Sequence, residues 1–161
     1  MEWRIAAAQL VQNARKSIDA YGAAMEPLCQ QTGMPRMAMD ILLFLANNPG
    51  FDTARDICQF RGLKPGIVSA YVERLAEEGF LERQQVPDDR RKTRLALTEK
   101  ARPLVDKGRR MQRAFAQRTM EGLTEEELSQ FVHCLKVFDR NLESIRQNGL
   151  TDEVECGMEM E

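Results

Sequence analysis

Apolar residues recur every three or four positions at both ends of the chain, which is the spacing of a helix with one apolar side. Near the N-terminus this pattern predicts a helix from Glu2 to about Leu28, whose stripe consists of Ala7, Val11, Ala14, Ile18, Tyr21, Met25 and Leu28. Near the C-terminus the stripe consists of Leu128, Phe131, Leu135, Phe138, Leu142 and Ile145. This second stripe follows Thr124 and Glu127, which have the spacing of a capping box.

A third long helix is predicted from Glu99 to about Glu121, with Thr98 as its N-cap and Gly122 at its end. Helices of about 20 residues or more are long for a small domain, whose own core cannot cover them all. We therefore expect the apolar stripes to pair between two copies of the chain. A bundle within one copy is the alternative, because an apolar stripe alone does not distinguish the two.

The middle of the chain has shorter elements separated by turn signals. Helices are predicted for Met37–Asn47, for Ala54–Phe60 with Asp52 or Thr53 as N-cap, and for Pro65–Glu78 with Gly79 at its end. The buried side of the third helix consists of Val68, Tyr71, Val72 and Leu75. Two short helices joined by a glycine-containing turn form a helix-turn-helix.

Two short, roughly alternating segments, Phe80–Val86 and Thr93–Thr98, flank the polar segment Pro87–Lys92. This pattern predicts a β-hairpin with a charged tip. Because the hairpin follows a helix-turn-helix, we interpret it as a wing. The expected fold is mainly α with a small β wing, a winged helix-turn-helix joined to a long helical dimerisation bundle.

The composition, with 43% hydrophobic and 30% charged residues in a chain of 161, is that of a single globular domain. No apolar run approaches the roughly 18 residues that a membrane-spanning helix needs. Met1–Arg4 and the Ala-rich residues that follow lack the basic segment and apolar core of a signal peptide. We therefore expect a cytoplasmic protein without a membrane partner.

Charge is distributed unevenly along the chain. The formal net charge is -2, but Gly149–Glu161 contains five acidic residues and no basic one, so residues 1–148 carry +3. Residues 51–118 contain 16 Lys or Arg and 10 Asp or Glu, a net charge of +6. A positive middle segment is a candidate phosphate-facing surface.

The residues that usually carry catalysis or bind metals are scarce. The four cysteines are scattered, with no Cys-x-x-Cys pair, and His133 is the single histidine. His133 and Cys134 are adjacent in a predicted helix, which places them about 100° apart around its axis. We therefore expect no enzyme, no catalytic residue, no metal site and no cofactor.

The helix-turn-helix and wing carry a family resemblance. The segments Gly62–Ser69, Val72–Leu75 and Glu78–Arg83 are followed by Asp89–Arg91 and Leu95–Thr98, and together they resemble the MarR family of winged-helix transcriptional regulators. The Asp-x-Arg…Leu-Thr signature of the wing is represented by Asp89, Arg91, Leu97 and Thr98. The resemblance extends over about residues 5–147.

The resemblance implies a homodimer that binds a pseudopalindromic operator on double-stranded DNA, usually as a repressor whose affinity a small ligand lowers. The implied organisation is an N-terminal dimerisation helix (1–35), a winged DNA-binding domain (36–98, with its recognition helix at about 65–78 and its wing at about 80–98), C-terminal dimerisation helices (99–148) and a disordered acidic tail (149–161). Family ligands are small amphipathic or aromatic anions that bind in a cleft between the dimer helices and the winged domain. Candidate residues lining that cleft are Met25, Met37, Met111 and Phe115, and core packing is the alternative for each.

By the family pattern, the recognition helix enters the major groove of DNA. Candidate contacts on or beside it are Lys64, Gly66, Ile67, Ser69, Ala70 and Arg74. Few of these side chains can form bidentate contacts with bases. Our hypothesis is that Ser69 reads a base directly, that Ile67 or Ala70 contacts thymine methyl groups, and that much of the specificity comes from DNA shape. A core position is the alternative for Ile67.

The wing supplies a second set of candidate DNA contacts, which are Arg90, Arg91, Lys92 and Arg94. A long arginine on a hairpin tip suits the negative potential of a narrow minor groove, and Arg91 is the best candidate for that insertion. Asp89 is expected to hold a wing arginine by a charge-assisted hydrogen bond. A solvated surface charge is the alternative for each of these arginines.

Two other functions remain open. The first is a winged-helix module whose basic surface binds an acidic protein. The second is a redox-sensing regulator in which Cys29 or Cys58 reacts with an oxidant, although a cysteine on a helix is more often a small buried side chain. The sequence does not identify the operator, the effector or the sign of regulation.

Overall fold

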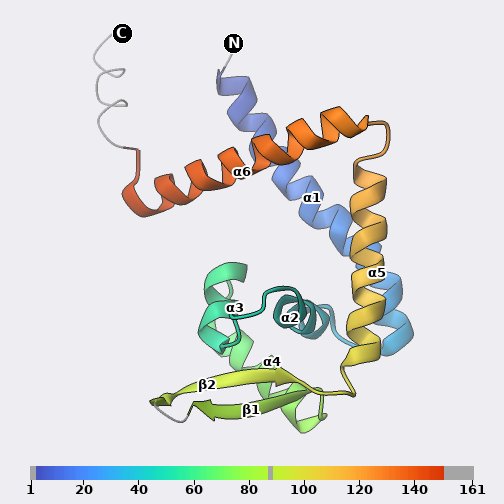
Figure 1. The fold of residues 1–161 in the computed structure, drawn as a ribbon, viewed down its shortest axis with the longest axis vertical. Helices are drawn as coiled ribbons and strands as arrows, with labels where there is room; N and C mark the ends of the chain where they lie inside the picture. The colour runs from blue at the N-terminus through green and yellow to red at the C-terminus, as the bar shows by residue number, and fades with distance from the viewer. Residues whose placement is uncertain (1–2, 87–88, 151–161) are drawn as a thin grey trace. The chain divides into compact units, whose positions relative to one another are not determined.

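The computed structural model describes the backbone of residues 3–86 and 89–150 and the side chains of residues 8–85 and 93–150. The elements follow one another as α1 (Trp3–Thr32), α2 (Arg36–Asn47), α3 (Ala54–Arg61), α4 (Pro65–Glu77), β1 (Leu81–Val86), β2 (Asp89–Leu97), α5 (Arg102–Thr119) and α6 (Glu125–Asn148) (Figure 1). The chain divides into two compact units, Met1–Ala116 and Gln117–Glu161. Each unit is described by itself.

Helix α2 is the centre of the first unit. Its residues Ala38–Phe44 are all buried, so apolar neighbours surround the helix on every side. The rest of the core comes from α1, α3, α4, the hairpin and the start of α5, through Met25, Leu28, Ile57, Val68, Val72, Leu75, Leu81, Leu95, Ala101 and Val105. The predicted mainly helical fold with a small β wing is confirmed.

Helix α1 extends to Thr32, past the predicted end at Leu28 and through Pro27. The Thr32 hydroxyl donates to the Leu28 carbonyl at 2.7 Å, and Gly33 then adopts a left-handed φ of 65°, which ends the helix. The apolar stripe divides in two along this helix. Met25 and Leu28 are buried, whereas Val11 is 74% exposed.

The two helices of the helix-turn-helix form where the sequence predicts them. Thr53, rather than Asp52, is the N-cap of α3, and a capping box with Asp56 closes its first turn. Gly62 adopts a left-handed conformation with a φ of 61° and ends α3. Helix α4 begins at Pro65 and buries Val68, Val72 and Leu75, while Tyr71 is half-buried.

Strands β1 and β2 form an antiparallel hairpin that pairs Leu81 with Leu97 and is irregular at Gln85 and Val86. The hairpin lies beside α4 (Figure 1). Strand β2 begins at Asp89, so the prediction of a turn spanning Pro87–Lys92 was too long. Two strands that face solvent need no alternating apolar residues, and a charged strand is therefore easily taken for a loop.

The predicted start of α5 at Glu99 was wrong, because the helix begins at Arg102. Thr98 does not cap α5, since its hydroxyl donates to the Gly79 carbonyl at 2.7 Å and its backbone N–H donates to Phe80. Thr98 is thus held at the end of the hairpin, and one turn intervenes before the helix. Pro103 then falls in the first turn of α5, where proline is tolerated.

The capping box predicted at the start of α6 is confirmed. The Glu127 carboxylate accepts hydrogen bonds from the backbone N–H and the hydroxyl of Thr124, at 2.8 and 2.9 Å. These bonds favour the ionised form and lower the pKa of Glu127. No residue of α6 is buried, and its stripe from Leu128 to Ile145 is 38–49% exposed. None of the described helices is long and apolar enough to cross a membrane.

The contact between α5 and α2 gives a stability prediction. A Cβ atom added at Gly108 would lie 2.7 Å from Cδ2 of Leu43, which is itself buried. Gly108→Ala should gain helix propensity but overpack this contact, for a net loss of about 1 kcal/mol in the free energy of unfolding. Urea denaturation at one fixed protein concentration would measure the change.

Gly66→Ala is the control, because nothing lies within 4 Å of the Cβ that it would add in α4. It should leave the stability unchanged or raise it slightly. Equal effects of the two substitutions would contradict a close approach of α5 to α2.

Candidate nucleic-acid interface

Helix α4 presents one face to solvent because Val68, Val72 and Leu75 turn the opposite face into the core. Ile67 is 43% exposed, as expected for a surface position rather than a core position. The other predicted contacts on this face are also exposed, namely Gly66, Ser69, Ala70 and Arg74. The structure thus brings the five candidates together on one side of the helix.

The N-terminal end of α4 is open and positively charged. Lys64 occupies the N-cap position but makes no side-chain capping hydrogen bond. Among the described residues, no carboxylate lies within ion-pair distance of Lys64, and its side chain is exposed. Together with the positive end of the helix dipole, the Lys64 ammonium makes this end of α4 suitable for a phosphate.

The C-terminal half of the exposed face contains the predicted contact Arg74 and a carboxylate, Glu73, that the sequence analysis did not single out. The Arg74 Nε atom donates to Glu78 Oε1 at 2.7 Å, and this hydrogen bond raises the pKa of Arg74. Arg74 therefore has a local partner one turn away. Glu73 is also exposed on this helix, and a carboxylate in the major groove can accept from cytosine N4. Glu73 faces solvent because it directly follows the buried Val72 and is turned about 100° from it around the helix axis.

The base of the wing is tied to the start of α3. Arg94 Nε lies 3.5 Å from Asp52 Oδ2, and the backbone N–H of Leu95 donates to the Asp52 carbonyl at 2.7 Å. Asp52 thus fixes the second strand of the wing rather than capping α3. The sequence does not reveal this pair, because its members are far apart in the chain.

The remaining candidates of the wing lie outside the part of the chain whose side chains are described. They are Asp89, Arg90, Arg91 and Lys92. Their backbone belongs to β2. Of the predicted wing contacts, Arg94 is the one whose side chain is described.

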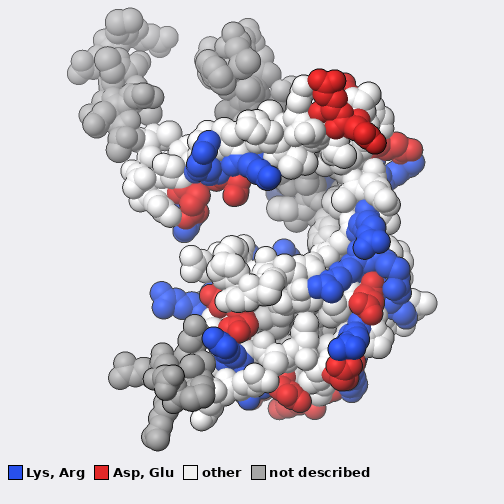
Figure 2. Space-filling model, in the orientation of Figure 1, with Lys and Arg blue, Asp and Glu red and all other residues white. Residues whose placement is uncertain are grey.

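A second basic surface follows α5 (Figure 2). This helix contains one acidic residue, Asp106, and six basic residues, which are Arg102, Lys107, Arg109, Arg110, Arg113 and Arg118. Arg109 is occupied within the fold, because its guanidinium donates to the Asn47 side chain and to the Ala46 carbonyl at the end of α2. A cation at this position interacts favourably with the negative end of the helix dipole.

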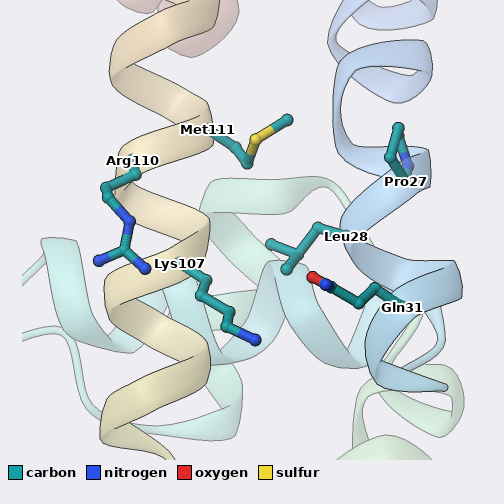
Figure 3. Close-up of a pocket in the computed structure, with 6 residues that line it drawn as sticks. All are labelled: Pro27, Leu28, Gln31, Lys107, Arg110 and Met111. Atoms are coloured by element: carbon teal, nitrogen blue, oxygen red, sulfur yellow. The ribbon is translucent and has the colours of Figure 1, made fainter.

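A groove of about 460 Å³ separates the C-terminal part of α1 from α5 (Figure 3). Leu28 and Gln31 of α1 and Lys107 and Met111 of α5 point into the space between the helices, while Arg110 points away from α1. Among the described residues, neither Lys107 nor Arg110 has an ion-pair partner. The groove thus combines an apolar wall with two cations at its rim.

The four candidate ligand-lining residues are not gathered in one place. Met111 lines the groove, whereas Met25 is fully buried in the core and Met37 is half-buried against it. Phe115 packs edge-on against Tyr21, with ring centroids 5.3 Å apart.

The cysteines that could sense oxidants are poorly placed for that role. Cys29 is buried, and its burial raises the pKa of the thiol, which reduces the reactive thiolate fraction. Cys58 is half-buried, and Cys134 is exposed on α6. Within the described ranges, no group of three or more His, Cys, Asp or Glu residues could hold a metal ion.

Comparison with known proteins identifies the helix-turn-helix segment. A family model described as MarR family matches residues 32–92, from the end of α1 into β2. The HTH-type transcriptional repressor IacR of Pseudomonas putida is 26% identical over 104 residues, which are 65% of this chain and 62% of that protein. The aligned region is less than two thirds of the length of IacR.

Solved structures share the fold over most of the chain. The transcriptional regulator PA3341 aligns with a TM-score of 0.72 and 24% identity, covering 86% of this chain and 98% of that one. A putative MarR family transcriptional regulator from Listeria monocytogenes, solved in complex with a 26mer DNA, aligns with a TM-score of 0.73 and 14% identity, covering 89% and 97%. The long helices on both sides of the helix-turn-helix therefore belong to the same architecture, and the segment 32–92 matches the MarR family model.

Proposed function

We propose that this protein is a cytoplasmic, dimeric, sequence-specific DNA-binding transcriptional regulator of the repressor type. The observation that carries the proposal is the exposed face of α4, which presents Ile67, Ser69 and Ala70 beside Lys64, a cation with no ion-pair partner among the described residues. A helix with one buried and one solvent-exposed face can enter the major groove, which is about 12 Å wide. IacR, a repressor by name, supports this choice over an enzyme.

Base recognition by α4 relies on small and apolar side chains. Ile67 and Ala70 are suited to contact thymine methyl groups, and the Ser69 hydroxyl can donate to or accept from a base edge. Lys64 and the wing arginines supply phosphate and minor-groove contacts, with Arg91 entering the minor groove and Asp89 orienting it. In this arrangement DNA shape contributes a large part of the specificity.

Two copies of the chain pair through their long helices. Helix α6 carries a continuous apolar stripe with no buried residue, and Val11 and Ile18 in the N-terminal half of α1 are also exposed. Contiguous apolar surface of this kind is unfavourable in water and is usually covered by another chain. In this organisation, residues 1–35 and 99–148 form the dimer and residues 36–98 bind DNA.

The groove between α1 and α5 is the effector site in this proposal. Its Leu28 and Met111 suit the apolar body of a small amphipathic or aromatic anion, and Lys107, which points into the groove, suits the anionic group. An effector that binds more tightly at one spacing of the two winged domains shifts the dimer toward that spacing.

Binding of an acidic protein to the basic surface is the competing function, and salt dependence separates the two. We expect the purified protein to bind a duplex selected from a random library more tightly than a scrambled duplex by about a thousandfold or more. Affinity for DNA should fall steeply as salt rises, because phosphate neutralisation releases counterions. Fluorescence anisotropy at two salt concentrations measures both quantities. Equal, weak binding of both duplexes would favour the protein-binding function.

The wing assignment predicts different effects for two arginines. Arg91→Ala should weaken binding of the selected duplex by about tenfold or more, because it removes a minor-groove contact. Arg118→Ala removes the same charge from α5, where Arg118 is exposed and paired with Glu121, and should have little effect. Equal losses in the anisotropy titration would contradict the placement of Arg91 in the minor groove.

The dimer assignment predicts dissociation when a charge enters the stripe of α6. Leu142→Asp should convert the dimer to monomer and abolish binding of the selected duplex, because burying an unpaired carboxylate in the interface is unfavourable. Light scattering coupled to size-exclusion chromatography gives the molar mass. Ser144→Asp adds the same charge on the other side of the helix and should leave a dimer. A dimeric Leu142→Asp protein would place the interface elsewhere.

A further inference from the structure

Asp40 is the one buried charged residue in the part of the chain whose side chains are described. It lies within the buried segment of α2, and its side chain is 9% exposed. A buried carboxylate is strongly unfavourable unless it is paired and hydrogen-bonded. The partners of Asp40 therefore show which parts of the fold this charge holds together.

Two arginines from different helices share the Asp40 carboxylate. Arg36 Nε, one turn earlier in α2, lies 3.2 and 3.1 Å from the two oxygens. Arg61 Nη2 lies 3.1 Å from Oδ2. Arg61 is the last residue of α3, and the left-handed Gly62 follows it directly. The Asp40–Arg61 ion pair thus anchors the start of the α3–α4 turn to the middle of α2.

The same cluster extends to α1 and α5. The Arg36 guanidinium stacks over the Tyr21 ring, with its central carbon 4.9 Å from the ring centroid. The Tyr21 hydroxyl accepts from Gln112 of α5 at 2.8 Å, and the Gln112 carbonyl oxygen accepts from Asn47 of α2 at 2.9 Å. Polar contacts therefore run without interruption from α5 and α1, through α2, to the turn before α4.

A small cavity of about 100 Å³ lies within this cluster. Its lining includes Tyr21, Asp40, Arg61 and Gln112, from α1, α2, α3 and α5. Side chains of four helices meet there, so the polar contacts of the cluster join these helices at this point alongside the apolar contacts of Leu43 and Phe44.

We propose that Asp40 and Arg61 are positioning residues for DNA recognition, which hold the turn before α4 against α2 and so fix the direction in which α4 presents its exposed face. Neither residue touches DNA in this role. The proposal rests on the proposed function. It assigns to Arg61 a task different from phosphate binding, which is the ordinary role of an exposed arginine beside a recognition helix.

Arg61→Gln separates positioning from phosphate binding. Arg61 is 41% exposed and Arg36 stays paired with Asp40, so the variant should fold, with a thermal stability lowered by the loss of one partner of a buried carboxylate. We expect its affinity for the selected duplex to fall by about tenfold, while its affinity for a scrambled duplex matches that of Arg55→Gln. Arg55 is the matched control because it lies in the same helix, is exposed and has no ion-pair partner among the described residues. Loss of a phosphate contact would instead lower both affinities equally and reduce the salt slope by about one.

For Asp40→Asn, electrostatics alone and the positioning role predict opposite changes in affinity for the selected duplex. Removing a negative charge from a DNA-binding domain should raise its affinity for every duplex if electrostatics alone decides. The positioning role predicts that affinity for the selected duplex falls. Affinity for the scrambled duplex should stay the same or rise. If Asp40→Asn does not fold, Arg61→Gln, which leaves the Arg36–Asp40 pair intact, still tests the proposal.

The outcomes distinguish this inference from the function on which it rests. A wild-type protein that does not prefer the selected duplex overturns both. A wild-type protein that does, together with an Arg61→Gln variant whose ratio of selected to scrambled affinity is unchanged, overturns the positioning role alone. A reduced ratio in Arg61→Gln but not in Arg55→Gln supports it.

Discussion

The structure depends on the burial of Ala38–Phe44 in the middle of α2. A helix that is buried on every side needs neighbours in all directions, and here α1, α4 and β2 contact it while Gly108 brings α5 close to Leu43. Helices α1, α4 and α5 and strand β2 are therefore all packed against one short helix. A change in the packing of α2 should therefore displace these elements, because a close-packed interior transmits strain rather than absorbing it. The buried Asp40 adds a second requirement, because its charge must stay paired with arginines of α2 and α3.

A second constraint is the length of the helices relative to the core. Met25 and Leu28 find partners within the first unit, but the same stripe farther toward the N-terminus does not, and α6 has no buried residue. Such helices are stable only when their apolar sides are covered, since isolated helices have little stability of their own. In the proposed dimer, pairing of the two chains would therefore support the folding of these segments as well as the geometry of DNA binding. Folding and recognition should accordingly depend on protein concentration together.

Local signals in the sequence predicted most elements, and tertiary contacts account for the exceptions. Thr124 and Glu127 lie three residues apart, so the start of α6 could be predicted from the sequence alone. Thr98 has the same chemistry as Thr124, yet it bonds to Gly79, which lies 19 residues earlier in the chain, and α5 therefore starts later. The exposed position of Ile67 follows from the helical phase of Val68 and Val72. The pairs Asp52–Arg94 and Asp40–Arg61 join distant segments, and no sequence pattern marked them.

The charges around α4 include cations paired within the protein and cations that are available for the proposed contacts with DNA. Arg74 is paired with Glu78, Arg94 with Asp52 and Arg61 with Asp40, so each of these arginines already has an anionic partner. Contact with a phosphate would require each to leave or share that partner, which reduces the gain in free energy. Lys64 has no such partner among the described residues, and its ammonium can bind a phosphate at full strength. The paired arginines are therefore better suited to fix the shape of the domain, while the unpaired cations and the arginines of the wing supply the salt-dependent part of DNA binding.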